Sequence, residues 1–268
     1  MSNLKYDTDI PVVVLCGGRG TRLREETEYR PKPMVEIGGR PVVWHIMRIY
    51  AHHGFKRFML CLGYKGFMIK EYFLNYRAIA NDFTLTLGRR ANISYIDHND
   101  EVDWTITMAD TGLDTMTGAR VKRIAKHLEG DRFMLTYGDG LADIDIERLV
   151  RFHRDTGRLV TVSGIRPPSR FGEMHVTGDV VTSFTEKPQV SEGLVNGGFF
   201  VCERGFLDYL SEDESCVLEQ DPLRQVAADG QLAVYTHTGF WQCMDTFREY
   251  ELLTNLWEEG RAPWRVWR

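Results

Sequence analysis

Apolar and polar residues alternate in blocks along the first 140 residues, and the blocks predict strands alternating with helices. Two short apolar runs, 11–16 and 57–62, have the length and character of buried strands. Between them, apolar residues recur at helical spacing over 41–53, and Gly54 ends the pattern. Further predictions are helices over 66–76 and 118–128, an extended segment over 92–110 and a buried strand over 132–137. This alternation is typical of an α/β fold whose mostly parallel sheet is covered on both faces.

The pattern changes after residue 158. Short strands are predicted over 159–165, 173–176, 180–185 and 195–202, separated by Pro-Pro and Gly-rich turns. Helices are predicted over 222–229 and 246–259. No linker separates the two parts, so we expect a single domain over 1–268, with a mixed extension of the sheet and C-terminal helices in 159–268.

Composition limits the partners and the location. The net charge is −5 and no block of Lys or Arg occurs, which argues against a nucleic-acid partner. The polar N-terminus and the lack of a long apolar run predict a cytoplasmic protein without membrane association. The five cysteines lack paired spacing, so neither a disulfide framework nor a zinc site is expected. Cys16, Cys61 and Cys202 lie in apolar runs and are expected to be buried.

A glycine- and arginine-rich segment follows the first predicted strand. It reads LCGGRGTR over residues 15–22, and Lys32 follows between two prolines. Glycines leave backbone N–H groups open and the basic side chains add positive charge, so the segment predicts a cradle for a polyphosphate. The segment lacks the Gly-Lys-Ser/Thr of a P-loop and the last glycine of a dinucleotide fingerprint. An ordinary surface loop is the alternative interpretation.

Two aspartates lie at the ends of predicted elements. Asp139 follows the strand over 132–137 in a Gly-Asp-Gly turn, and Asp245 precedes the last helix. Ligands of open α/β sheets bind at the carboxyl ends of strands. Two carboxylates together with phosphate oxygens suit Mg²⁺, so both are candidate metal ligands. The alternatives are an ordinary turn residue for Asp139 and a helix N-cap for Asp245.

Polar residues of the second half suit a phosphorylated sugar. Glu186 and Lys187 close a predicted strand, Asn196 begins an Asn-Gly-Gly turn, and Gly172 is a candidate backbone contact. A carboxylate and an amide bind sugar hydroxyls, and a lysine binds a phosphate monoester. A solvated salt-bridge turn is the alternative for Glu186 and Lys187. The eight histidines lack metal-ligand spacing, so we expect structural or surface roles for them.

Longer motifs extend these signals along nearly the whole chain. They are GTRL with EET, RPKPMVEIGGRPVVWHIM, GYKG with IKEYF, DTG with TMTGAR, TYGDG, FGE, EKP, NGGFFV, GFWQCMDT and APWRVW. The set resembles the sugar-1-phosphate nucleotidyltransferases, and within them the glucose-1-phosphate cytidylyltransferases. The resemblance implies a Rossmann-like three-layer nucleotidyltransferase fold with Mg²⁺ as cofactor, in a homo-oligomer. It also implies that a cytidylyl group passes from CTP to α-D-glucose 1-phosphate, giving CDP-glucose for deoxysugar or surface-polysaccharide (O-antigen) biosynthesis.

The resemblance assigns roles to individual residues. Residues 1–158 would form the nucleotide-binding half, with contacts from Leu15, Gly17, Gly18, Gly20, Thr21, Arg22, Lys32, Thr117 and Arg120. Arg120 would be the main contact to cytosine and ribose. The sugar phosphate would be bound by Tyr137, Gly172, Glu186, Lys187, Asn196, Gly198 and Trp241. Asp139 and Asp245 would bind Mg²⁺, and catalysis would rest on Arg22, Lys32, Lys187 and Asp139.

The sequence leaves other interpretations open. Arg19, Arg30 and Cys243 depart from the usual residues of the resembled motifs, and Arg19 bears on the choice of nucleotide. The same chemistry with another NTP or a modified hexose 1-phosphate is one alternative. An inactive sugar-nucleotide sensor is another, and the intact Asp139 and Asp245 argue against it. The C-terminal tryptophans, including Trp264, are expected to pack internally or to dock on a neighbouring chain.

Overall fold

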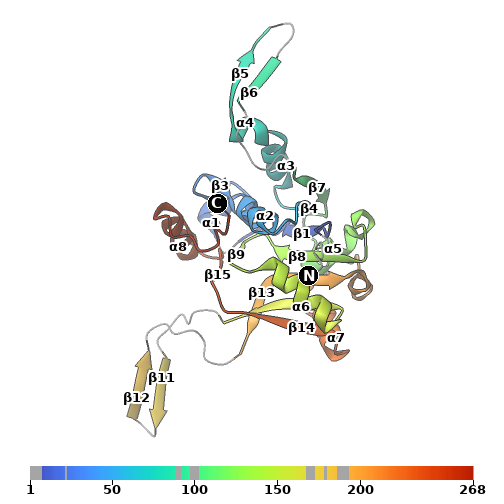
Figure 1. Ribbon diagram of the computed structural model, residues 1–268, viewed down its shortest axis with the longest axis vertical. Helices are drawn as coiled ribbons and strands as arrows, with labels where there is room; N and C mark the ends of the chain where they lie inside the picture. The colour runs from blue at the N-terminus through green and yellow to red at the C-terminus, as the bar shows by residue number, and fades with distance from the viewer. Residues whose placement is uncertain are drawn as a thin grey trace, which may run out of the picture.

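The centre of the protein is a seven-stranded sheet in the order β14-β10-β13-β8-β1-β4-β7 (Figure 1). The computed structural model describes residues 8–21, 23–88, 92–96, 103–166, 173–177, 180–185 and 193–267. The strands of the sheet are β1 (Val12–Cys16), β4 (Arg57–Leu62), β7 (Thr105–Asp110), β8 (Arg132–Tyr137), β10 (Val160–Ile165), β13 (Val195–Glu203) and β14 (Leu232–His237). β13 runs antiparallel to β8 and β10, and the other neighbouring pairs are parallel. The predicted mostly parallel α/β sheet is confirmed, and strands of the second half extend it.

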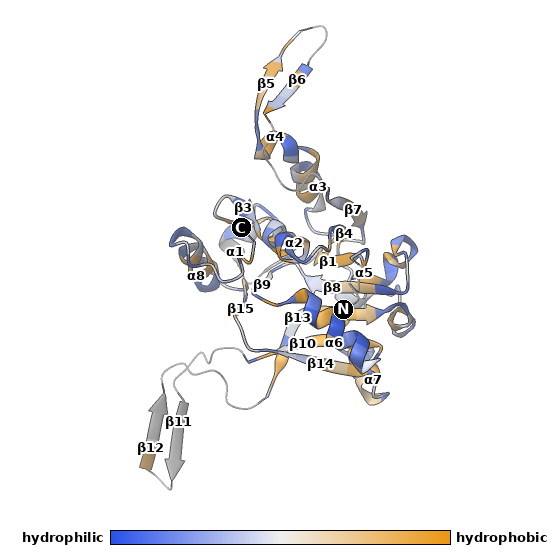
Figure 2. Ribbon diagram, viewed as in Figure 1, coloured by the Kyte–Doolittle hydropathy of each residue, from blue (hydrophilic) through white to orange (hydrophobic). Residues whose placement is uncertain are grey.

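Strand β1 shows how the sheet separates two cores. All five of its residues are buried. Val12, Val14 and Cys16 belong to one apolar cluster, whereas Val13 and Leu15 belong to another. Successive side chains of a strand point to opposite faces, so a fully apolar run requires cover on both faces. Figure 2 shows the apolar colouring along β1 and β10 and the hydrophilic colouring along α6.

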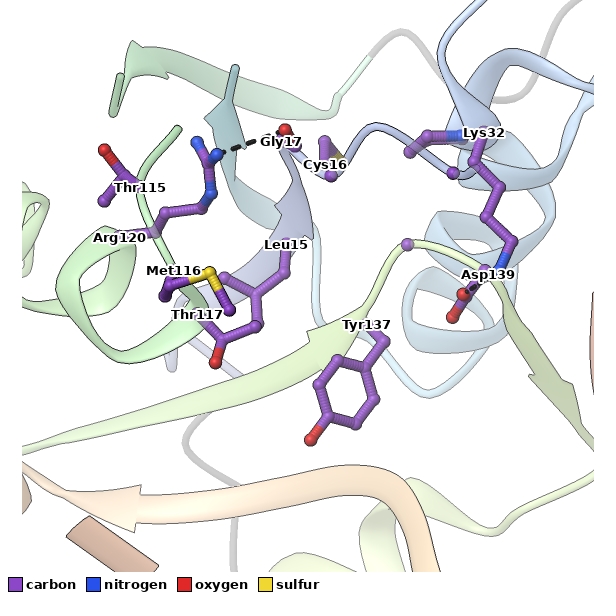
Figure 3. A pocket seen from close by; sticks show the side chains of 14 residues that line it. Leu15, Cys16, Gly17, Lys32, Thr115, Met116, Thr117, Arg120, Tyr137 and Asp139 are labelled. Atoms are coloured by element: carbon purple, nitrogen blue, oxygen red, sulfur yellow. Dashed lines mark hydrogen bonds and ion pairs between the residues drawn. The ribbon is translucent and has the colours of Figure 1, made fainter. Parts of the chain in front are cut away.

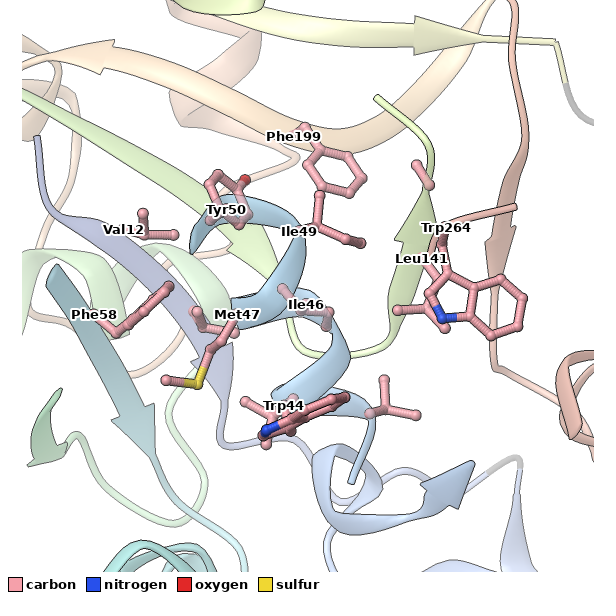
Figure 4. Close-up of a cluster of buried hydrophobic side chains, with 14 of the residues drawn as sticks. Val12, Trp44, Ile46, Met47, Ile49, Tyr50, Phe58, Leu141, Phe199 and Trp264 are labelled. Carbon is pink, nitrogen blue, oxygen red and sulfur yellow. The ribbon is translucent and has the colours of Figure 1, made fainter. Parts of the chain in front are cut away.

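Helices α2 (Val42–His52), α6 (Ile146–Thr156) and α8 (Phe247–Glu258) cover the first face. The α2 residues Ile46, Met47 and Ile49 are fully buried against β1 and its neighbours (Figure 4). The opposite face is covered by α5 (Thr117–Arg123), the 3₁₀ segments η2 (Ala125–His127) and η3 (Arg204–Tyr209), and α7 (Asp221–Ala228). The arrangement is therefore three-layered, as the resemblance implied.

Short elements surround this body. Along the first half these are α1 (Arg24–Thr27), η1 (Lys32–Met34), the pair β2 (Glu36–Ile37) and β3 (Arg40–Pro41), and helices α3 (Gly66–Leu74) and α4 (Tyr76–Ala80). The hairpin of β5 (Asp82–Thr86) and β6 (Asn92–Ile96) extends from α4 away from the sheet (Figure 1). A second antiparallel hairpin joins β11 (Glu173–Thr177) and β12 (Val180–Thr185). Finally, β9 (Gly140–Ala142) pairs with β15 (Trp241–Cys243).

The structure differs from the predicted elements in several places. The single helix predicted over 66–76 is divided at Asn75, whose φ of −98° and ψ of 8° end α3. Helix α6 was not predicted, although the Asp145 side chain caps it and Gly157 ends it at φ 59°. Strands β9 and β15 were also not predicted. Of the extended segment over 92–110, β6 and β7 are strands, and residues 97–102 lie outside the described residues.

The C-terminal tail packs on its own chain. Trp264 is fully buried, and its indole N–H donates to Nδ1 of His45 at 3.4 Å. Nε2 of His45 lies 2.9 Å from the carbonyl oxygen of Ile37, so this nitrogen carries the proton and the imidazole is neutral. Burial lowers the pKa of His45 to about 4. The expected structural role of histidine is confirmed here, and docking of Trp264 on a neighbouring chain is wrong because its site is internal.

Within the described residues, the longest helices fall well short of the length and apolar character that a membrane crossing requires. Cys16, Cys61 and Cys202 are buried, as predicted.

Candidate active site

A pocket of about 290 Å³ opens where β1 and β8 end (Figure 3). We call it the loop pocket. Its lining comes from the glycine loop, η1, the start of α5 and the turn after β8: Leu15, Cys16, Gly17, Gly18, Gly20, Lys32, Pro33, Thr115, Met116, Thr117, Arg120, Tyr137, Gly138 and Asp139. Segments more than 100 residues apart therefore meet at the carboxyl ends of two parallel strands, where α/β folds bind ligands.

Arg120 holds the glycine loop from one side of the end of β1 (Figure 3). The residue is 4% exposed, and its terminal nitrogens donate to Leu62 O (3.1 Å), Thr111 Oγ1 (2.8 Å), Gly112 O (2.7 Å), Gly17 O (3.1 Å) and Leu113 O (3.3 Å). Burial lowers the pKa of Arg120, and these acceptors compensate the buried charge. Gly17 packs directly on the guanidinium, because a Cβ there would lie 2.2 Å from Arg120 Cζ.

These contacts bear on how a base could be recognised. The Gly17 carbonyl already accepts from Arg120 and from the Tyr64 N–H at 3.2 Å, which uses both of its lone pairs. The terminal nitrogens of Arg120 already donate to acceptors within the protein. A contact between Arg120 and cytosine stays a prediction. What the geometry supports directly is a structural role, in which Arg120 sets the position of the loop.

Lys32 lies on the other side of the loop and contacts both predicted metal ligands. Its ammonium donates to Asp139 Oδ2 at 2.6 Å and also to Asp245 Oδ1. Burial alone would lower the pKa of Lys32, but the two carboxylates outweigh burial and the pKa is raised. The Lys32 side chain is 12% exposed, and those of Asp139 and Asp245 are 26% and 29% exposed. Two carboxylates thus face one cation, and here that cation is the Lys32 ammonium.

The small β9–β15 pair brings the two aspartates together. Gly140 pairs with Cys243, and the Met244 N–H donates to the Asp139 carbonyl at 2.9 Å. The alternative of an N-cap role for Asp245 is wrong, because the cap of α8 is Thr246 in a capping box with Glu249. The carboxylate of Asp245 is therefore directed to Lys32 rather than to the helix end.

A second pocket of about 240 Å³ adjoins the first, and we call it the tryptophan pocket. It is lined by Thr136, Tyr137, Asp139, Gly140, Gly197, Gly198, Phe199, Trp241, Cys243 and Asp245. The Trp241 indole donates to the Gly197 carbonyl at 2.7 Å. Gly198 has φ 81°, and a Cβ there would lie 2.6 Å from Tyr137 Cδ2, so glycine is required. Tyr137 and Asp139 line both pockets, so ligands in the two would be neighbours.

A hydrogen-bonded chain of polar groups crosses from one pocket to the other. The Asn196 amide donates to the Tyr137 hydroxyl at 3.0 Å, and that hydroxyl donates to Glu219 Oε1 at 2.6 Å. The other oxygen of Glu219 accepts from the Thr117 hydroxyl at 2.8 Å. Burial, and then Glu219, raise the pKa of Tyr137, which keeps the phenol protonated. Glu219 could not be selected from the sequence, because no motif surrounds it and its partners lie 82 and 102 residues away.

Comparison with known proteins decides the family. Residues 11–256 match the model of the nucleotidyl transferase family. This chain belongs to the nucleotidyl transferase family. It is 46% identical over 256 residues to the glucose-1-phosphate cytidylyltransferase of Salmonella typhimurium, covering 95% of this chain and 98% of that one. It is 42% identical to the probable glucose-1-phosphate cytidylyltransferase of Bacillus subtilis, covering 95% and 99%. The predicted resemblance is confirmed.

Solved structures of lower identity share the fold of this nucleotidyltransferase. HddC from Yersinia pseudotuberculosis is similar with a TM-score of 0.67 at 22% identity, covering 92% of this chain and 99% of that one. The inositol-1-phosphate CTP transferase from T. maritima has a TM-score of 0.65 at 16% identity, covering 97% and 98%. At these identities the likeness concerns the fold alone.

Most of the predicted site residues of this nucleotidyltransferase come together. Of the predicted nucleotide contacts, Leu15, Gly17, Gly18, Gly20, Lys32, Thr117 and Arg120 line the loop pocket. Thr21 is exposed and is not part of that lining. Of the predicted sugar contacts, Tyr137, Gly198 and Trp241 line the tryptophan pocket, and Asn196 bonds to Tyr137. The predictions for Arg22, Gly172, Glu186 and Lys187 fall outside the described residues.

Proposed function

We propose that this nucleotidyltransferase transfers a cytidylyl group from CTP to α-D-glucose 1-phosphate, forming CDP-glucose and pyrophosphate. Support for the substrate pair is the 46% identity, over 95% of the chain, to the glucose-1-phosphate cytidylyltransferase of Salmonella typhimurium. The observation that carries the chemistry is the meeting of the glycine loop, Lys32, Asp139 and Asp245 at two adjoining pockets. The loop pocket would take CTP, and the tryptophan pocket would take the sugar phosphate.

The chemistry requires positioning more than proton transfer. A phosphate oxygen of glucose 1-phosphate attacks the α-phosphorus of CTP, that bond forms as the bond to pyrophosphate breaks, and the two products separate. A phosphate monoester is already anionic at neutral pH, so no general base is needed. The glycine loop would hold the phosphates through its N–H groups, and the Lys32 ammonium would stabilise charge on them. The protonated Tyr137 phenol fits this scheme as a hydrogen-bonding group rather than a base.

Mg²⁺ is the proposed cofactor, and Asp139 and Asp245 are the residues that would hold it. Their fit rests on the Lys32 ammonium, which already shows that the two carboxylates can share one positive charge. Within the described residues no cluster of three or more His, Cys, Asp and Glu ligands occurs. Mg²⁺ commonly takes one or two carboxylates together with water and phosphate oxygens. The pair of Asp139 and Asp245 fits this coordination. When bound, Mg²⁺ neutralises phosphate charge.

The resemblance supports the remaining parts of the proposal. Arg22 would contact the triphosphate, Lys187 the sugar phosphate, and Glu186 and Gly172 the sugar hydroxyls. The enzyme would be a cytoplasmic homo-oligomer built from a single domain over 1–268. Its product would serve deoxysugar or surface-polysaccharide biosynthesis.

One panel of assays tests the proposed function. Pyrophosphate release would be measured with CTP, UTP, GTP, ATP and dTTP, each against glucose, galactose and mannose 1-phosphates. We expect kcat/KM to be highest for CTP with glucose 1-phosphate, by about 100-fold or more over UTP, because a buried polar contact rejects a mismatched base strongly. Equal use of UTP and CTP would exclude the cytidylyl assignment. Activity with none of the pairs would favour the sugar-nucleotide sensor.

A further inference from the structure

Glu219 accepts hydrogen bonds from Tyr137, which lines both pockets, and from Thr117, which lines the loop pocket. It is exposed, it precedes α7, and each of its carboxylate oxygens accepts one hydroxyl proton. We propose that Glu219 is a positioning residue, which orients Tyr137 and Asn196 for the sugar phosphate and Thr117 for the nucleotide. The inference rests on the proposed function, since it assigns the two hydroxyl groups to the two substrate pockets.

The direction of the hydrogen bonds follows from the carboxylate. An ionised carboxylate only accepts, so the Tyr137 hydroxyl must donate its single proton to Glu219 at 2.6 Å. The Tyr137 oxygen then accepts from Asn196 Nδ2 at 3.0 Å. The amide oxygen of Asn196 accepts from the Gly198 N–H at 2.8 Å, which fixes the same orientation from the other side. Glu219, acting through Tyr137, and the Gly198 N–H together determine which end of the Asn196 amide is the donor.

This orientation leaves one donor for a ligand. An amide nitrogen carries two protons. Among the described residues, only the Tyr137 hydroxyl accepts from Asn196 Nδ2, so its second N–H can be donated to an oxygen of the sugar phosphate. Without Glu219, the Tyr137 proton could turn to another acceptor, and only the Gly198 N–H would hold the orientation of the Asn196 amide. The expected consequence is weaker binding of the sugar phosphate, with Asp139 and Asp245 unaffected.

The second oxygen of Glu219 acts on the loop pocket. It accepts from Thr117 Oγ1 at 2.8 Å, and the same hydroxyl accepts from the Leu218 N–H at 2.9 Å. Thr117 is the first residue of α5 and lines the loop pocket. One carboxylate thus fixes a hydroxyl beside each substrate, which would align the two substrates relative to each other.

Backbone contacts hold the segment around Glu219 without its side chain. The Met116 N–H donates to the Glu214 carbonyl at 2.9 Å, and the Gly118 N–H donates to the Cys216 carbonyl at 2.9 Å. These bonds attach residues 214–216 to the start of α5. Because they do not involve the carboxylate, a substitution at Glu219 should leave the fold in place.

The test compares Glu219→Ala and Glu219→Gln with Glu212→Gln, a matched exposed glutamate of the same segment. KM and kcat would be measured separately for CTP and glucose 1-phosphate, together with the thermal unfolding midpoint. We expect Glu219→Ala to raise KM for glucose 1-phosphate by about 10-fold or more, the size of one charged hydrogen bond, and KM for CTP by about 3-fold. Glu219→Gln keeps one acceptor and should show a smaller rise, and Glu212→Gln should match the wild type.

A double substitution isolates the Tyr137 contact. Tyr137→Phe removes the hydroxyl that links Glu219 to Asn196, so Glu219→Ala in the Tyr137→Phe background should change KM for glucose 1-phosphate by less than about 2-fold. Additive effects would overturn the inference, as would a lowered unfolding midpoint in Glu219→Ala with both KM values unchanged. A wild type that does not use CTP with glucose 1-phosphate would reject the proposed function and this inference with it. An active wild type and an unaffected Glu219→Ala variant would reject the inference alone.

Discussion

The loop pocket is built around a buried guanidinium, whereas the tryptophan pocket is built around hydroxyl and amide groups. Arg120 is 4% exposed, and four of its five acceptors are backbone carbonyls around the end of β1. On the side of the tryptophan pocket, side-chain hydrogen bonds link Tyr137 to Asn196 and to Glu219. A buried charge fixes a backbone firmly because breaking its contacts is costly, while the loss of one side-chain hydrogen bond to the exposed Glu219 should cost less. Substitutions should therefore affect the two pockets differently.

The largest effect is expected where the two pockets meet. Asp139→Asn and Asp245→Asn should each lower kcat by roughly 100-fold or more, because they remove charge that is preorganised at the reacting phosphates. Folding should change little, since both residues lie at the ends of elements. The measurement is kcat at saturating Mg²⁺, with the exposed Asp208→Asn as the control. Near-normal turnover in either variant would refute its role.

The next effect concerns the loop pocket alone. Arg120→Ala removes the donors that hold Gly17 and its neighbours, and kcat/KM for CTP should fall by roughly 10–100-fold. The CTP-over-UTP preference should persist, because Arg120 positions the loop and does not itself distinguish the two bases. The KM for glucose 1-phosphate should persist, because the tryptophan pocket is not displaced. Steady-state kinetics with both nucleotides measures this. Loss of the base preference in the variant would instead place Arg120 in direct contact with the base.

A third prediction separates the two tasks of Lys32. Lys32→Ala should raise KM for CTP by about 10-fold, with little change in KM for glucose 1-phosphate. The same variant should bind Mn²⁺ several-fold more tightly in the absence of nucleotide, because the ammonium no longer competes for Asp139 and Asp245. Free Mn²⁺ can be followed by electron paramagnetic resonance. Unchanged Mn²⁺ binding would contradict competition between the ammonium and the metal.

The smallest effect on turnover is expected away from both pockets, at His45. Its pKa is lowered from 6.5 to about 4 by burial, so its contribution to stability is present above pH 6.5 and is lost as the pH falls towards 4. The loss attributable to His45 should reach roughly 3 kcal/mol of unfolding free energy. Urea unfolding between pH 7.5 and 4 measures it. His45→Gln should be less stable at pH 7.5 but should lose less on acidification, and an equal loss would exclude His45 as the cause.

Local patterns explain most of what could be predicted. The apolar runs of β1, β4 and β8 identified the central strands, because a strand buried on both faces has to be apolar throughout. The missed helix α6 was also encoded locally, with Ile146, Leu149, Val150 and His153 on one face between an Asp cap and a glycine stop. Strands β9 and β15 have only three residues each, too few for a recognisable alternation.

By itself, the sequence determined the family and the α/β class, and it predicted the residue types of the candidate site, because glycine loops and strand-ending aspartates are recognisable within a few neighbouring residues. The tertiary structure decided which partner each of these residues has. Asp139 and Asp245 meet through β9–β15 pairing across about 100 residues, Arg120 binds the loop rather than standing open in the pocket, and Glu219 joins two pockets. Hydrogen bonds and ion pairs act only over a few ångströms, so they depend on chain segments brought together by folding. A local sequence pattern does not contain the distances between segments that are far apart in the chain.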